Sequence, residues 1–188
     1  MTSKVAIANL ALTYVGQSPI TSLEDGTESA ITIKAIYDSV AESAMSDADW
    51  SGCVFRQKLT STGNTPVFDY AYEYNLPTDP SFVRFLNSDK YDDQLRLEGG
   101  FIYANVSPFY VRYIGIQTDT EKYGVYLRDN LVNRLAYTLC YHITGLQSMA
   151  SARYNIWSRE LPLLARKDAG NNQRGKVNGG KLLINVRQ

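Results

Sequence analysis

Three groups of carboxylates are the side chains in this sequence best suited to do chemistry. They are Asp47 with Asp49, Asp69 with Glu73, and Asp92 and Asp93 with Glu98. A glycoside hydrolase needs an acid and a base about 5–10 Å apart, in environments that separate their pKa values. Sequence spacing cannot establish such a distance, and carboxylates in loops and at strand edges are usually only solvated. We therefore expect no enzyme, and a cell-wall hydrolase using a carboxylate pair is the alternative.

Other reactive side chains are few. His142 is the only histidine, and no serine or cysteine motif near it indicates a triad, so we expect a core or interface histidine. Cys53 and Cys140 match no metal or redox spacing, which predicts buried free thiols. The sequence contains no Walker-type loop and no GxGxxG fingerprint. We predict no cofactor and no metal ion.

Tyrosine is abundant, with 14 residues in a chain of 188. Its large apolar ring and polar tip make it common at protein–protein interfaces. Tyr70, Tyr72 and Tyr74 alternate with Ala71 and Glu73, which suits one face of a small core as well as it suits an interface. Together with Tyr110 and Tyr113 of a later apolar run, they are our candidate contacts to another subunit.

Helical patterns open and close the chain. Apolar residues recur at helical spacing over residues 3–15 and 27–46, and Thr27 is the expected N-cap of the second helix. The pattern returns from Gly124 to about Ile143, where leucines step by four residues. A fourth helix is predicted from about Ser148 to Leu164, and Pro162 should kink or end it unless the helix restarts there.

The middle of the chain has the period of two that is typical of strands. Strand patterns cover residues 68–75, 82–86 and 109–114, and a hairpin joins 95–98 to 101–103 through Gly99 and Gly100. Short connections favour antiparallel pairing. No pattern is recognisable over residues 51–66.

The order of these patterns predicts an α+β fold. We expect a four-helix bundle with a small antiparallel β insertion between helices 2 and 3, and an extended C-terminal tail. The expected domains are 1–50 with 123–169 for the bundle, 51–122 for the β-rich insertion, and 170–188 for the tail.

Charge is balanced overall but distributed unevenly. Lys+Arg and Asp+Glu are 19 each, yet residues 170–188 contain four basic residues and no acidic residue. The other 169 residues therefore contain 15 basic and 19 acidic residues. Because phosphate binding needs clustered Lys and Arg, we expect this acidic body to lack a phosphate-binding surface. The first 17 residues predict neither a signal peptide nor a membrane span.

The tail combines four glycines and four asparagines with one short apolar run, so it cannot bury enough surface to fold alone. A β-prone run at the end of a basic, flexible segment can add as a strand to the sheet edge of a partner. We predict a docking arm whose contact residues are Arg174, Lys176, Val177, Lys181, Leu182, Leu183, Ile184, Val186 and Arg187. A disordered terminus is the alternative.

Several short segments, in a particular order, resemble one protein family. An opening helix runs into Val15-Gly16-Gln17-Ser18-Pro19-Ile20, and Ser22-Leu23-Glu24-Asp25-Gly26-Thr27 follows. Trp50 comes shortly after the second helix, and Tyr70-Ala71-Tyr72 leads to Leu76-Pro77-Thr78-Asp79. This arrangement resembles the head-to-tail adaptor proteins of short-tailed bacteriophages, also called tail tubular protein A. Residues 51–66 match nothing in that pattern.

The resemblance implies a structural virion protein and not an enzyme. It implies a homo-oligomeric ring of twelve copies between the portal protein and the tail nozzle protein, with the tail gripping the portal. Genomic DNA would be a partner only in transit through the lumen during ejection. Such a protein is made in the host cytoplasm and ends in the virion tail, at the head–tail junction, without membrane insertion. A cytosolic scaffold unrelated to phages, with the tail as its peptide ligand, is a third possibility.

Overall fold

The computed structural model describes residues 3–88 and 95–173. In these residues the chain forms four α-helices, two short 3-10 helices and six strands. In chain order these are α1 (Lys4–Tyr14), α2 (Glu28–Ser46), η1 (Ser51–Cys53), β1 (Val54–Leu59), β2 (Tyr72–Asn75), β3 (Phe82–Ser88), β4 (Leu95–Glu98), β5 (Phe101–Ala104), β6 (Phe109–Gly115), η3 (Thr120–Lys122), α3 (Val125–Thr144) and α4 (Gln147–Gln173).

The strands form two separate antiparallel sheets of three strands each. Sheet A has the order β1-β6-β3, and sheet B has the order β2-β5-β4. The predicted fold class, a four-helix bundle with a small antiparallel β insertion, is therefore wrong. The middle of the chain is a two-sheet unit with its own hydrophobic core, and strands of both sheets contribute to that core.

Strand β1 is the element that the sequence pattern does not reveal. Its residues Arg56, Gln57 and Lys58 are consecutive and all exposed, so they break the period of two. Pairing with β6 places this strand at an edge of sheet A. Strand β2 is in turn shorter than predicted, because Asp69 adopts a positive φ of 66° and only residues 72–75 pair with β5.

The helices pack around a second core. The Thr27 side chain caps α2 by accepting a hydrogen bond from the Ala30 N–H at 3.3 Å, as predicted. Asn9 of α1 fixes the following loop, since its amide accepts from the N–H of Ile20 at 2.8 Å and donates to the carbonyl of Ile20 at 2.9 Å. Trp50 is fully buried in this core.

Helix α4 continues through Pro162 to Gln173. The helix therefore does not end at Pro162, and it extends beyond Leu164, the last residue of the predicted helix. Leu161, Leu164 and Ala165 pack against the helical core on both sides of the proline. We infer that this packing offsets the hydrogen bond that proline cannot donate. Within the described residues, no helix is both long enough and apolar enough to cross a membrane.

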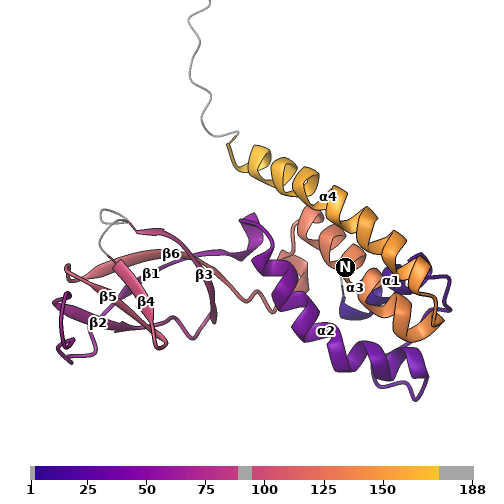
Figure 1. Ribbon diagram of the computed structural model, residues 1–188, viewed down its shortest axis with the longest axis horizontal. Coiled ribbons are helices and arrows are strands. Elements are labelled where there is room, and N and C mark those ends of the chain that lie inside the picture. The colour runs from indigo at the N-terminus through magenta and orange to yellow at the C-terminus, as the bar shows by residue number, and fades with distance from the viewer. Residues whose placement is uncertain (1–2, 89–94, 174–188) are drawn as a thin grey trace, which may run out of the picture.

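The helices and the two sheets lie side by side as two lobes (Figure 1). Ile114 of β6 is part of the helical core, and Arg84 of β3 forms an ion pair with Asp49 at 2.7 Å. The Gln117 amide also donates to the Gly52 carbonyl at 3.3 Å. These contacts surround the segment that leads from α2 into β1.

Candidate functional site

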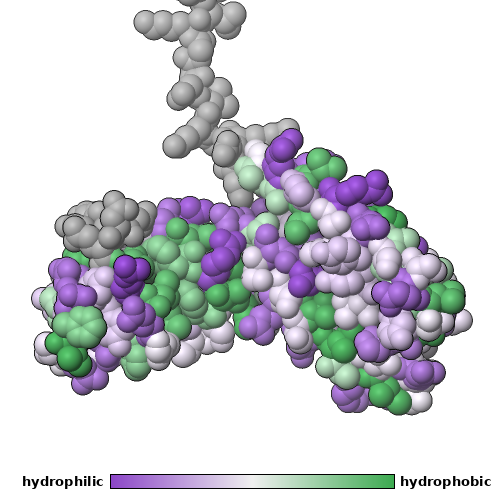
Figure 2. All heavy atoms as spheres, in the orientation of Figure 1, coloured by the Kyte–Doolittle hydropathy of each residue, from purple (hydrophilic) through white to green (hydrophobic). Residues whose placement is uncertain are grey.

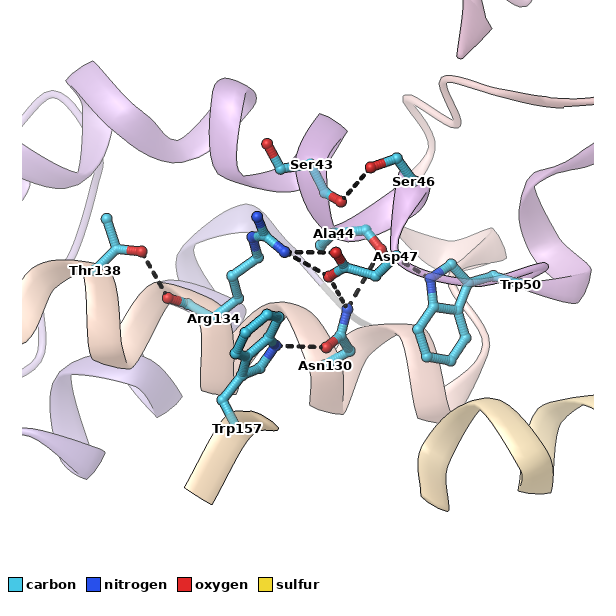
Figure 3. Close-up of polar contacts among 9 residues, drawn as sticks. All are labelled: Ser43, Ala44, Ser46, Asp47, Trp50, Asn130, Arg134, Thr138 and Trp157. Atoms are coloured by element: carbon cyan, nitrogen blue, oxygen red, sulfur yellow. Dashed lines mark hydrogen bonds and ion pairs between the residues drawn. The ribbon is translucent and has the colours of Figure 1, made fainter. Parts of the chain in front are cut away.

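A cluster of polar side chains joins α2, α3 and α4 (Figure 3). Arg134 Nη1 lies 2.6 Å from both carboxylate oxygens of Asp47. The Asn130 amide is fully buried, and its nitrogen donates to Asp47 Oδ2 at 3.0 Å and to the Ala44 carbonyl at 3.3 Å. Its oxygen accepts from the indole nitrogen of Trp157 at 2.9 Å. These contacts fix α4 to the end of α2 through side chains of α3.

A second polar anchor holds α4 near its C-terminal end. Asp168 is buried, and its carboxylate accepts from the Ser51 N–H at 2.7 Å and from the Ser51 hydroxyl at 3.1 Å. Burial, and then the charge of Asp168, raise the pKa of the Cys53 thiol to about 12. Helix α4 is thus tied to η1, at the joint between the two lobes.

Of the residues in these two anchors, only Asp47 was singled out from the sequence, as a candidate acid or base and not as an anchor for a helix. Asp168 follows Leu161, Leu164 and Ala165 at helical spacing, so an acidic residue on the apolar face was the available signal. The apolar pattern of the predicted fourth helix was followed only to about Leu164, so Asp168 was not considered.

The predicted docking-arm residues lie outside the described residues. They are Arg174, Lys176, Val177, Lys181, Leu182, Leu183, Ile184, Val186 and Arg187. The predicted tail begins at Gly170, whereas α4 includes residues 170–173. The first four residues of the predicted tail therefore belong to α4.

The candidate interface tyrosines divide into two groups. Tyr74 and Tyr113 are buried in the core of the β lobe, where their hydroxyls donate to the carbonyls of Val106 at 2.5 Å and Pro80 at 3.0 Å. These two side chains stabilise the β lobe and offer no surface to another subunit. Tyr70 is half-buried, and Tyr72 and Tyr110 are exposed.

The loop before β2 exposes two large hydrophobic side chains. Val67 is 96% exposed and Phe68 is 73% exposed. Figure 2 shows hydrophobic residues at the surface of both lobes, so apolar surface is not confined to the helices. Exposed apolar residues next to each other often mark a protein–protein contact. We call residues 66–70 the apolar loop.

Three of the predicted carboxylates line one cavity of about 310 Å³ in the β lobe, namely Asp69, Glu73 and Glu98. The cavity also includes Tyr103, and Glu73 accepts from the Thr62 hydroxyl at 2.9 Å. Partial burial, and then the Glu73 carboxylate, raise the pKa of Tyr103. Asp47 and Asp49 lie elsewhere, in ion pairs. Asp92 and Asp93 lie outside the described residues.

Sheet A carries a cluster of cations. Arg56, Lys58 and Arg112 line a groove of about 520 Å³ together with Asn87 and Tyr110. The expectation that the acidic body lacks clustered Lys and Arg is therefore wrong, because strand pairing gathers cations that are distant in sequence. We call these five residues the basic groove.

The other side chains singled out for chemistry are two cysteines and one histidine. Cys53 and Cys140 are buried free thiols, as predicted. His142 is exposed in the last turn of α3 beside Tyr141, so it is not a core residue. Within residues 3–88 and 95–173, no group of three or more His, Cys, Asp and Glu side chains could hold a metal ion.

The sequence was also compared with known protein families and with curated proteins. No family model matches the chain, and no curated protein sequence matches it significantly.

Proposed function

We propose that this chain is a structural virion protein, a head-to-tail adaptor that joins the portal protein to the tail nozzle. About twelve copies would form a ring whose lumen passes the genome, and residues 174–188 would bind the portal. The proposal rests first on the order of sequence segments that resemble this family.

The structural observation that supports the proposal most is how α4 is held. The Asp47–Arg134–Asn130–Trp157 cluster fixes the helix at its middle, and Asp168 fixes it one turn before its end. A docking arm is most effective when it leaves the body from a defined point, because less freedom is then lost on binding. Helix α4 supplies such a point next to the joint between the lobes (Figure 1).

The exposed apolar loop also suits an assembled state. Val67 and Phe68 contribute little to the fold of a single chain, whereas in a ring they could be covered by the next copy. A ring needs such a heterologous contact, in which one patch of each subunit meets a different patch of its neighbour.

The test is to mix the purified chain with the portal protein and to measure the mass of the complex by light scattering. We expect the full-length chain to form a large complex of fixed stoichiometry. A truncation ending at Gln173 keeps α4 whole and should stay unbound. If the truncated chain assembles equally well, residues 174–188 are not the arm, and if neither form binds, the adaptor proposal fails.

Two matched variants separate the contributions within the arm. L182S/L183S/I184S removes the β-prone run and keeps every charge, whereas R174Q/K176Q/K181Q/R187Q removes the charge and keeps the run. Strand addition predicts that the first variant loses binding at all salt concentrations. The second variant should bind more weakly than the unchanged chain at physiological salt, where charge attraction brings the partners together. At high salt, where that attraction is screened, the two should differ little.

A virion-associated cell-wall hydrolase remains the second candidate, because Asp69, Glu73 and Glu98 line one cavity with Tyr103. The test measures release of soluble fragments from purified peptidoglycan by the chain and by D69N, E73Q and E98Q variants. D49N is the matched control, since Asp49 lies outside the cavity in an exposed ion pair. Activity that is lost in a cavity variant and retained in D49N would favour the hydrolase.

A further inference from the structure

The basic groove is formed by pairing across three strands of sheet A. In the β1–β6 register Arg56 lies directly opposite Arg112, and Lys58 lies opposite Tyr110. In the β3–β6 register Asn87 lies opposite Arg112. The groove therefore contains one row of two arginines and an amide, followed by a row with a lysine and a tyrosine. Residues two apart on a strand are about 7 Å apart, so the rows are separated by roughly that distance.

Among the residues that the structure describes, the positive charges of the groove are not balanced. Like charges directly opposite on neighbouring strands destabilise a sheet. In the described residues Arg56, Lys58 and Arg112 have no ion-pair partner, and no carboxylate lines the groove there. Arg112 Nε is buried and, within the same residues, makes no hydrogen bond. An anion in the groove would neutralise the charge and accept hydrogen bonds from the guanidinium groups that line it.

The side chains that line the basic groove indicate which class of anion would bind there. Asn87, Tyr110 and the arginines offer hydrogen-bond donors, whereas the side chain of Val111 is buried in the core of the β lobe. A hydrophilic polyanion therefore fits this groove better as a ligand than an apolar protein surface does. The two rows can contact successive charges of an extended ligand. Tyr110 is 42% exposed, so its ring can stack on a base or a sugar.

We propose that the basic groove of sheet A binds the phosphodiester backbone of nucleic acid. This site is additional to the portal-binding arm and to the ring contacts, and a single chain suffices to form it. Its failure is therefore distinguishable from failure of the adaptor proposal, which is tested by the mass of the portal complex.

The experiment measures fluorescence anisotropy of labelled duplex and single-stranded DNA, each roughly 20 nucleotides long, titrated with the full-length chain over a range of salt concentrations. R56Q/K58Q/R112Q should weaken binding roughly tenfold or more. It should also lower the slope of log affinity against log salt by about one for each cation that contacts a phosphate. Circular dichroism checks the fold, and K58Q alone, at an exposed position, gives the same readout if the triple variant unfolds.

Two controls remove similar charge elsewhere. R159Q/R166Q/K167Q removes three exposed cations of α4, and R174Q/K176Q/K181Q/R187Q removes the four cations of the predicted arm. We expect the α4 variant to bind DNA as tightly as the unchanged chain does. The arm variant should keep the part of the slope of log affinity against log salt that comes from the basic groove. It is overturned if the chain binds neither DNA, if the groove variant binds unchanged, or if poly-glutamate at equal charge competes as well as DNA.

Discussion

Arg134 and Asp47 form a close ion pair, in which a single guanidinium nitrogen contacts both carboxylate oxygens at 2.6 Å. Asp47 is the C-cap of α2, where the helix dipole disfavours a negative charge. Arg134 offsets that cost and also lies over the Trp157 ring, with 5.1 Å between its guanidinium carbon and the ring centroid. The pair therefore links the end of α2 to both closing helices.

Breaking this pair should destabilise the chain strongly. The two side chains are only 19% and 13% exposed, so D47A leaves the Arg134 charge poorly solvated. We expect a loss of about 3 kcal/mol in the free energy of unfolding, at the lower end for a buried pair because some exposure remains. Urea denaturation measures it. The control D38A breaks the exposed Lys4–Asp38 pair and should cost less than about 1 kcal/mol. If D47A and D38A lower the free energy of unfolding equally, the buried Asp47–Arg134 pair stabilises the chain no more than the exposed pair does.

Asp168 should determine how firmly the end of α4 is attached. D168A leaves the Ser51 N–H without its acceptor and should cost about 1–3 kcal/mol. Hydrogen exchange should increase over the last turns of α4 and over η1, and should change little in sheet B. K167A alters the neighbouring exposed residue and serves as the control. Unchanged exchange in D168A would mean that packing alone holds this end of the helix.

Gly52 lies where η1 meets the backbone before α3. A Cβ atom at this position would lie 2.5 Å from the Lys122 carbonyl oxygen, which a backbone shift alone can relieve. We expect G52A to lower the melting temperature, with a cost of about 1–3 kcal/mol. G26A is the matched control, since nothing lies within 4 Å of a Cβ there and its φ is not positive. That variant should be neutral or slightly stabilising, because alanine restricts the unfolded chain.

The sequence predicted the elements whose side chains follow a regular period. Helices α1, α2 and α3 and the β4–β5 hairpin lie within a few residues of the predicted limits, because their apolar faces or turn glycines are visible locally. Strand β1 was missed because three consecutive polar residues hide its period, and its partner β6 lies some 50 residues away. The basic groove was missed for the same reason. The number of acidic and basic residues can be counted in a sequence. Which of them are neighbours across two strands depends on the register of the pairing, which the sequence does not show.

Stability should fall at alkaline pH because of Cys53. Its folded pKa is raised to about 12, above an unfolded value of about 8.5, so between these values the folded state holds more protons. The free energy of unfolding therefore decreases as pH rises through that window, by at most about 1.4 kcal/mol per pH unit. Tyr37 and Tyr123 also have raised pKa values but add to the decrease only above about pH 10. Urea denaturation of C53A between about pH 8.5 and 10 should show a shallower dependence, and an unchanged slope would exclude this thiol as the cause.

The apolar loop should matter for assembly and not for folding. Val67 and Phe68 are 96% and 73% exposed, so V67S/F68S should change the free energy of unfolding by less than about 0.5 kcal/mol. If the loop is a contact between copies, the same variant should lose large complexes in analytical ultracentrifugation with the portal protein. L163S, at an exposed leucine of α4, is the matched control and should assemble normally. Assembly of V67S/F68S at the full mass would show that the loop faces solvent in the ring, and the contact would then have to involve other surfaces, with Tyr72 and Tyr110 the next to change.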